Sequence, residues 1–168
     1  MRQTKSIALC GVTAALATVI QLIGGMLGLG TYASPMLAGL CLLPAGEALG
    51  KKPHILLWLC VSALSFLLVP DVEQNLMFLC LFGCYPILRP LFQRLPKALC
   101  LLCKFLFVNL ITIALEALVL FVLVPEPMSI PLMLILLVLG NITFFCYDLV
   151  LPRVQQLLSH RLAAFLRK

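Results

Sequence analysis

The stretch LCLLCKFLFVNLITIALEALVLFVLV runs from Leu99 to Val124 and lies between two prolines. At a helical rise of about 1.5 Å per residue, it is long enough to cross a hydrocarbon core of about 30 Å with some tilt. Polar residues interrupt it at Asn109, Thr112 and Glu116, which are spaced three and four residues apart and therefore share one helical face. The pattern predicts a membrane-spanning helix with a single polar stripe.

Glu116 is the residue of this stretch that points most directly to a function. An ionised carboxylate that faces lipid at this depth costs about 3 kcal/mol, so its side chain is expected to face protein or a water-filled cavity. Two interpretations stay open at this point. Either Glu116 binds a substrate, or it is protonated or hydrogen-bonded to a neighbouring helix and holds the bundle together.

The composition is that of a protein embedded in a membrane along nearly its whole length. Of 168 residues, 63% are hydrophobic and 11% are charged, and the mean hydropathy is +1.16. This apolar share is higher than that of a soluble domain, which is about 45–50%. We therefore expect an all-α, polytopic membrane protein, with one transmembrane domain over 1–152 and a tail helix over 153–168.

Six apolar segments are expected to span the membrane. They cover about 6–29, 31–49, 55–69, 76–88, 99–124 and 132–151. The second contains Pro35 and Pro44 and is expected to be kinked or broken. After the sixth, apolar residues recur at helical spacing from Val154 to Phe165. This recurrence predicts an amphipathic tail helix that lies on the membrane surface or packs on a partner subunit.

Basic residues are confined to alternate connections, apart from one lysine just inside the fifth span. The opposite connections carry only Asp71, Glu73 and Glu126 as charged residues. Because cytoplasmic loops carry the excess of Lys and Arg, both termini are expected in the cytoplasm. Basic residues at the ends of apolar segments favour anionic membrane lipids as partners and argue against nucleic acid. Asp148, near the cytoplasmic face, is expected to pair with Arg153 or another basic residue.

The sequence contains no catalytic constellation. The eight cysteines all lie in apolar runs, and the two histidines, His54 and His160, are not spaced with them as metal ligands. Cys100 and Cys103 form a Cys-x-x-Cys, but the charge pattern puts this pair on the reducing cytoplasmic side, which argues against a redox enzyme. There is also no phosphate-binding glycine motif. We expect no enzymatic activity, no metal and no cofactor.

Several polar residues are expected to meet in the outer half of the membrane. Counting from the outer helix ends puts Gln21, Glu116 and Asn141 at a depth of about 10 to 15 Å. Asn109 and Thr112 share the face of Glu116, with Asn109 lying deeper. We expect these five residues to form a substrate pocket. Because no Lys or Arg lies on that side, the pocket suits a neutral or cationic molecule better than an anion.

In these features the chain resembles the S components of energy-coupling factor (ECF) transporters, small bacterial proteins of six helices that capture a vitamin or another micronutrient. The likeness rests on the opening from Lys5 to Gly28, which has small residues at four-residue spacing, on YPILRP at 85–90, and on the size with both termini inside. The resemblance implies a substrate pocket in the outer half and a location in the bacterial cytoplasmic membrane. It also implies a coupling transmembrane subunit and two ATPases as partners.

The first helix of that family typically carries Ala-x-x-x-Ala and contacts the coupling subunit. The matching positions here are Gly11 and Ala15, with Ala14 and Thr18 as a second register. Such small residues let another helix approach closely. Nickel or cobalt is not expected as the substrate, because the start MRQTK lacks the early histidine of family members that carry these metals. A thiamine-like or flavin-like molecule fits the charge argument.

A second interpretation is a scaffold of the cell envelope that transports nothing, similar in size to the rod-shape protein MreD. Glu116 would then only hold helices together. A sealed bundle in which Glu116 and Asn141 bond to neighbours favours the scaffold. An outer-half cavity that reaches Glu116 favours the carrier.

Overall fold

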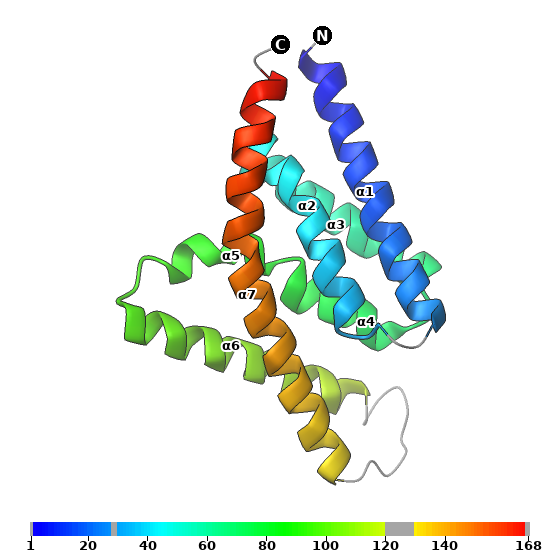
Figure 1. Cartoon of the computed structure of the whole chain (residues 1–168). Coiled ribbons are helices and arrows are strands. Elements are labelled where there is room, and N and C mark those ends of the chain that lie inside the picture. Colours follow the sequence, from blue (N-terminus) through cyan, green and yellow to red (C-terminus); the bar gives the residue numbers. More distant parts are fainter. Residues whose placement is uncertain (1, 28–29, 120–129, 167–168) are drawn as a thin grey trace.

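The computed structural model of the chain describes residues 2–27, 30–119 and 130–166. These residues form helices joined by short turns, with no strand among them (Figure 1). The elements are α1 Arg2–Leu27, α2 Ala33–Leu49, α3 Lys51–Leu68, α4 Val72–Met77, the π-helix η1 Phe78–Phe82, α5 Tyr85–Phe92, α6 Lys97–Leu118 and α7 Ile130–Leu166. The predicted all-α fold is confirmed.

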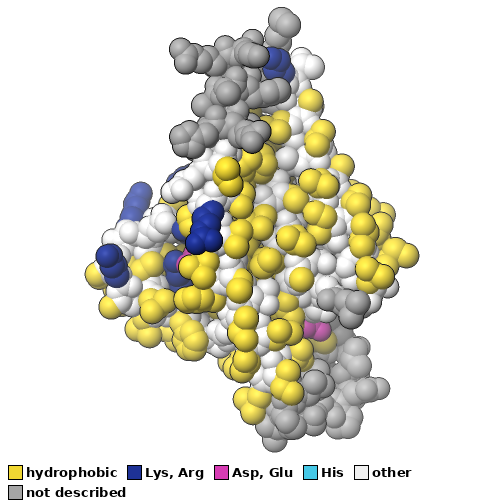
Figure 2. Space-filling model, in the orientation of Figure 1, with side chains coloured by type: hydrophobic (Ala, Val, Ile, Leu, Met, Phe, Trp, Pro, Cys, Tyr) yellow, Lys and Arg dark blue, Asp and Glu magenta, His cyan; other side chains and the backbone are white. Residues whose placement is uncertain are grey.

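Five helical segments are long and apolar enough to cross a membrane, and the shorter apolar α2 accompanies them. The five are Thr4–Leu27, Lys51–Leu68, Val72–Phe92, Lys97–Leu118 and Leu134–Leu158. Large apolar side chains such as Leu67 and Leu110 stand exposed on the outside, and Figure 2 shows hydrophobic groups spread over the described part of the visible face. Such a surface suits lipid and not water, so the chain is a polytopic membrane protein.

Flanking residues complete the third and fourth spans, which run over Lys51–Leu68 and Val72–Phe92. Gly50 has a positive φ of 91° and turns the chain between α2 and α3, so Lys51 begins the new helix directly. Asp71 caps α4 by accepting a hydrogen bond of 3.1 Å from the backbone N–H of Gln74. The expected end of the fifth span, together with Glu126, falls in 120–129 and lies outside the described residues.

Of the two expectations for the second span, a kink or a break, the break is wrong, because α2 is one continuous helix from Ala33 to Leu49. Pro35 lies in the first turn of α2. Backbone N–H groups of the first turn have no acceptor within the helix, so the N–H that proline lacks costs no helical hydrogen bond. Pro44 lies inside the helix, which continues past it to Leu49. The neighbouring Leu42, Leu43 and Ala45 are all buried, so packing holds this turn in place.

The tail is a continuation of α7 and not a separate helix. We expected a boundary between 152 and 153, but α7 runs through Pro152 as one helix of 37 residues. Val154 and Leu158 pack against the core beyond the proline. Gln155 accepts a hydrogen bond of 3.0 Å from Arg89 and donates one of 3.0 Å to Glu47. These contacts hold the continuation in line with the membrane-spanning part.

The start of α1 and the end of α7 lie at the same end of the molecule (Figure 1). We call the side that carries Lys51, Lys52, Arg89, Lys97 and Arg153 the basic side. The acidic side, defined by Asp71 and Glu73, contains the turns that follow α1 and α3. In Figure 2 the dark blue groups lie in the upper and left parts of the view; one magenta group lies low on the right, and another lies beside the blue groups on the left. The charge segregation expected from the sequence is therefore present in the fold.

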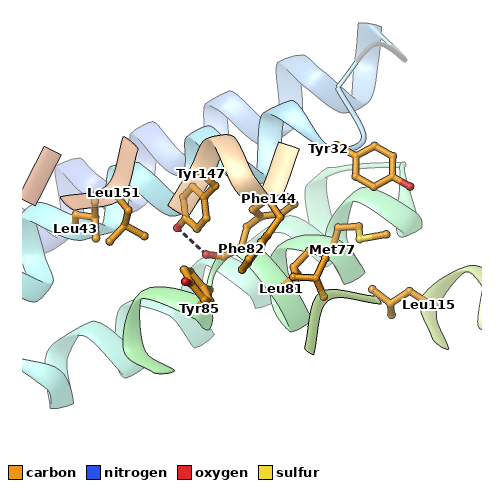
Figure 3. Packing of buried hydrophobic residues seen from close by; sticks show 11 residues of the cluster. Tyr32, Leu43, Met77, Leu81, Phe82, Tyr85, Leu115, Phe144, Tyr147 and Leu151 are labelled. Atoms are coloured by element: carbon orange, nitrogen blue, oxygen red, sulfur yellow. Dashed lines mark hydrogen bonds between the residues drawn. The ribbon is translucent and has the colours of Figure 1, made fainter. Parts of the chain in front are cut away.

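A glycine, a proline and a tyrosine together fix the centre of the bundle. Pro86 has no N–H, so the Phe82 carbonyl lacks its helical donor. The buried Tyr147 hydroxyl replaces that donor at 2.9 Å, as the dashed line in Figure 3 shows. A Cβ at Gly39 would lie 2.7 Å from the Tyr147 hydroxyl and 2.8 Å from the Phe82 carbonyl oxygen. Only glycine therefore lets α2 approach this hydrogen bond.

Candidate functional site

Glu116 is buried near the acidic side, in the last turn of α6. Its side chain is 2% exposed. The Tyr32 hydroxyl, immediately before α2, donates a hydrogen bond of 2.9 Å to Glu116 Oε1. Oε2 has no hydrogen-bond partner among the described protein groups. A buried polar atom without a partner costs about 1–3 kcal/mol, and more when the group is charged. Oε2 is therefore a buried acceptor whose hydrogen-bond partner is not found among the described protein groups.

Thr112 lies one turn before Glu116 on the same face, as the sequence predicts. It is 1% exposed, and its Oγ1 has no partner among the described residues. A Cβ at Gly140 of α7 would lie 3.3 Å from Tyr32 Cε1 and 3.7 Å from Thr112 Cγ2. The absence of a side chain at Gly140 lets α6, α7 and Tyr32 pack closely. We call Tyr32, Thr112, Glu116 and Gly140 the Glu116 site.

Tyr32 is a site residue that the sequence reasoning missed. The sequence gives only a weak signal for it. Tyr32 follows a glycine-rich stretch at the start of an apolar segment, and amphipathic aromatic side chains are common at such positions. Tyr32 is 5% exposed, and its hydroxyl acts as a donor to Glu116 Oε1.

Gln21 belongs to a second polar group, formed with Gln74 and Asn75. Gln21 is fully buried, and both polar atoms of its side chain lack partners within the described chain. Its backbone carbonyl accepts a hydrogen bond of 2.7 Å from Gln74 Nε2. Gln74 Oε1 and Asn75 Oδ1 are also buried without a described partner. We call these three residues the amide cluster. The helix α4, which carries two of them, packs against both α1 and α6 and so links the cluster to the helix of Glu116.

Asn109 and Asn141 bond to each other. Asn109 Nδ2 donates to Asn141 Oδ1 at 3.1 Å, and Asn141 Nδ2 donates to Asn109 Oδ1 at 3.0 Å. Each amide nitrogen also donates at 2.8 Å to a carbonyl of its own helix, that of Phe105 or Leu137. Every amide N–H of the pair is therefore used. The pair fastens α6 to α7 and offers no free donor.

A cavity of about 680 Å³ opens between α6 and α7. Asn141 lines it together with apolar side chains, whereas Gln21, Thr112 and Glu116 are not among its lining residues. The five residues expected to share one pocket are thus divided. Thr112 and Glu116 are together, Gln21 lies in the amide cluster, and the asparagines form their own pair.

Asp148 is held by basic residues near the basic side, as the sequence predicts. Its Oδ2 lies 2.7 Å from Lys104 Nζ, and its Oδ1 lies 3.4 Å from Arg89 Nε. The Tyr85 hydroxyl also donates a hydrogen bond to Oδ1. The partners come from α5 and α6, so Arg153 of the same helix is not needed. Asp148 therefore has a structural role that ties three helices together.

The small residues of α1 separate into an outward and an inward register. Gly11 and Ala15 are exposed, and a Cβ at Gly11 would meet no atom within 4 Å. Ala14 packs against a buried apolar cluster, and Thr18 is 7% exposed. The Thr18 hydroxyl donates to the Ala14 carbonyl at 2.9 Å. Of the two registers considered for a helix contact, the one with Gly11 and Ala15 is open to a partner.

The cysteines form no bonds with one another. All eight are free thiols, including Cys100 and Cys103. Within residues 2–27, 30–119 and 130–166, no three His, Cys, Asp or Glu side chains are placed to hold a metal ion.

Comparison with protein-family models, with curated proteins and with solved structures finds no match to this chain.

Proposed function

We propose that this chain is the substrate-binding membrane subunit of an ECF-type importer, which captures a neutral or cationic vitamin-like micronutrient from outside the cell. The observation that carries the proposal is the state of Glu116. One of its buried oxygens is held by Tyr32, and the other has no partner among the described residues. A carboxylate that only joins helices is expected to use both oxygens, because each unpaired one is costly. A carboxylate that receives a substrate leaves one oxygen for it.

The chemistry around Glu116 favours a ligand rich in hydrogen-bond donors. When ionised, the Glu116 carboxylate offers Oε2 as an acceptor only, and the nearby Thr112 hydroxyl can donate or accept. The described part of the acidic side has no Lys or Arg and carries Asp71 and Glu73. An anion would meet repulsion there with no basic group to offset it. A neutral heterocycle with N–H groups or a cationic nitrogen fits this environment.

The outward face of α1 is the proposed contact for a coupling subunit. Gly11 and Ala15 leave a shallow path along the helix, flanked by exposed apolar residues such as Val12, Leu16 and Val19. Small residues at four-residue spacing allow two membrane helices to approach closely. In this proposal two ATPases supply the work, and the protein lies in a bacterial cytoplasmic membrane with both termini inside.

A scaffold of the cell envelope is the second candidate function, and two observations favour it. The cavity between α6 and α7 does not reach Glu116. The Asn109–Asn141 pair uses all of its amide N–H groups within the bundle, which is how polar residues behave when they only hold helices together. The same argument does not extend to Glu116, since its second oxygen is unpaired.

Affinity purification in mild detergent from native membranes tests the proposal. Mass spectrometry of the co-purifying proteins should identify a coupling membrane protein and two ATPases. Gly11→Leu with Ala15→Leu should remove these partners. The matched pair Ala63→Leu with Ala114→Leu, at exposed positions of α3 and α6, should keep them. Recovery of envelope-synthesis proteins without ATPases would contradict the proposal and favour the scaffold.

A further inference from the structure

The junction of α1, α2 and α4 on the acidic side has no residue in common with the Glu116 site. Each of these helices packs against the other two, and Figure 1 shows the end of α1 beside the start of α2 and beside α4. We define the α1–α2–α4 junction by five residues whose atoms lie close together, Gly24, Gly25, Ser34, Asp71 and Gln74.

The two glycines bring oxygen atoms of α2 and α4 against the last turn of α1. A Cβ at Gly24 would lie 1.7 Å from Ser34 Oγ and 3.3 Å from Gln74 Oε1. A Cβ at Gly25 would lie 3.7 Å from Gln74 Oε1 and 3.7 Å from Asp71 Cβ. Because Ser34 Oγ and Gln74 Oε1 both lie within 3.3 Å of one point, they are close enough to contact the same bound ion.

Gln74 Oε1 is a buried acceptor that faces this junction. Gln74 is fully buried, and its amide nitrogen donates to the Gln21 backbone carbonyl at 2.7 Å. This hydrogen bond fixes the amide, so the oxygen is directed at the glycines of α1. It has no hydrogen-bond partner among the described residues. A buried oxygen without a donor is costly, and a bound cation would remove that cost.

The charges at the junction favour a cation. Asp71 Oδ1 accepts from the Gln74 backbone N–H at 3.1 Å, and Oδ2 accepts from the Thr31 hydroxyl at 3.5 Å. Both partners are uncharged, and neither ion pair between described residues includes Asp71. Gly24 and Gly25 lie in the last turn of α1, and the C-terminal end of a helix carries partial negative charge. The junction thus gathers negative charge with no positive group among the described residues.

We propose that the α1–α2–α4 junction binds one sodium ion, with Ser34 Oγ, Gln74 Oε1 and the Asp71 carboxylate among its ligands. Hard cations take oxygen ligands, and carbonyls at helix C-terminal ends coordinate Na⁺ in other membrane proteins. A single carboxylate suits a singly charged ion better than Ca²⁺ or Mg²⁺, and the close approach at Gly24 favours a small one. The ligand set contains no His or Cys, so the usual spacing patterns of metal ligands do not reveal it.

The bound ion would join three helices at the point where α2 begins. Thr31 contacts Asp71, and the next residue, Tyr32, donates to Glu116. Sodium would therefore also fix the start of α2, from which Tyr32 reaches the Glu116 site. The sodium site itself does not depend on a transported substrate or a coupling subunit.

Binding of radioactive Na⁺ to the purified full chain in detergent, measured by scintillation proximity, tests the proposal. The wild type should bind one ion per chain, which unlabelled Na⁺ displaces and choline does not. Asp71→Asn removes the charge but keeps a good N-cap residue for α4, so the fold should persist. Loss of an outer-shell partner alone costs about 10–100-fold in metal affinity, so Asp71→Asn should weaken Na⁺ binding by at least about 10-fold. The matched variant Glu73→Gln removes one charge from the same helix outside the junction and should bind nearly as the wild type does.

A second pair of variants tests the neutral oxygens. Ser34→Ala removes Oγ from the junction, whereas Ser62→Ala removes a buried hydroxyl that donates to the Trp58 carbonyl of its own helix. Only Ser34→Ala should weaken Na⁺ binding, and thermal unfolding in choline chloride checks that each variant folds. A wild type without saturable Na⁺ binding would overturn the proposal. So would an affinity for Na⁺ that is unchanged in Asp71→Asn, or lowered equally by Glu73→Gln.

Discussion

Tyr32 and Glu116 are 84 positions apart in the sequence and share a buried hydrogen bond of 2.9 Å. The bond joins the start of α2 to the last turn of α6 and fixes the direction of the carboxylate. With Oε1 held by Tyr32, Oε2 is the oxygen left for a ligand. Tyr32 is therefore a positioning residue for Glu116 in our proposal.

Tyr32→Phe should lower the free energy of unfolding by about 1–3 kcal/mol, because the buried carboxylate then loses its described donor. Equilibrium unfolding of the purified chain in detergent measures this. The same substitution in a Glu116→Leu background should cost clearly less, since no carboxylate remains to be paired. An equal loss in both backgrounds would show that the hydrogen bond itself contributes nothing.

Asp148→Asn should destabilise the fold by about 2 kcal/mol. The estimate lies between exposed pairs, at about 0–1 kcal/mol, and fully buried pairs, at about 3–5 kcal/mol, because the Lys104 and Asp148 side chains are 14% and 23% exposed. Lys104→Met should cost less in the Asp148→Asn background than alone, as a double-mutant cycle would measure. The control Lys52→Ala, at an exposed unpaired lysine, should change stability by no more than about 0.5 kcal/mol. Additive losses would contradict the pairing.

Gly39→Ala and Gly11→Ala should shift stability in opposite directions. A Cβ at Gly39 meets the Tyr147 hydroxyl and the Phe82 carbonyl, and overpacking of this kind costs about 1–3 kcal/mol. Gly11 has open space around it, and alanine in a helix interior is about 0.5–1 kcal/mol more favourable than glycine. Thermal unfolding of the two variants side by side decides this. Equal stability of both would mean that α2 does not depend on close approach at Gly39.

The Asn109–Asn141 pair should show a small positive coupling. Hydrogen bonds between membrane helices average about 0.6 kcal/mol and reach about 1.7 kcal/mol, so Asn109→Ala and Asn141→Ala should be non-additive by an amount in that range. Thr143→Ala is the control, because the Thr143 hydroxyl bonds only to the Leu139 carbonyl of its own helix in the described contacts. The coupling free energy between Asn109→Ala and Thr143→Ala should be close to zero. If it is as large as the coupling between Asn109→Ala and Asn141→Ala, the two asparagines do not form a specific pair.

The spans and the charge asymmetry could be predicted because they depend on local composition. Apolar runs and the positions of Lys and Arg are properties of each segment, so they do not depend on how the helices pack against one another. The pairing of Asp148 with a basic residue could be predicted for a similar reason, since a carboxylate in an apolar segment near many cations finds one. Its actual partners, Lys104 and Arg89, depend on how α5 and α6 approach α7 and could not be named.

The composition of the Glu116 site could not be predicted, because it depends on crossings between distant helices. Helical spacing correctly places Thr112 beside Glu116 on one face. It says nothing of which residue faces them from another helix, and Tyr32 was missed for that reason. Likewise, a shared depth for Gln21 and Asn141 did not mean a shared pocket, because α1 and α7 present these side chains to different neighbours. The continuation of α7 through Pro152 depends on contacts of Gln155 with other helices.

Retention of a small molecule by the purified chain tests whether Glu116 receives a substrate. The full chain and Glu116→Gln are purified in parallel from native membranes, and the molecules released on denaturation are identified by mass spectrometry. With Tyr32 bonded to the amide oxygen, Glu116→Gln turns an N–H₂ towards the ligand in place of an acceptor. We predict a stoichiometric metabolite with N–H groups or a cationic nitrogen on the wild type and on the control Glu47→Gln, and its loss from Glu116→Gln. A wild type without any metabolite, or a metabolite that Glu116→Gln retains equally, would contradict the claim.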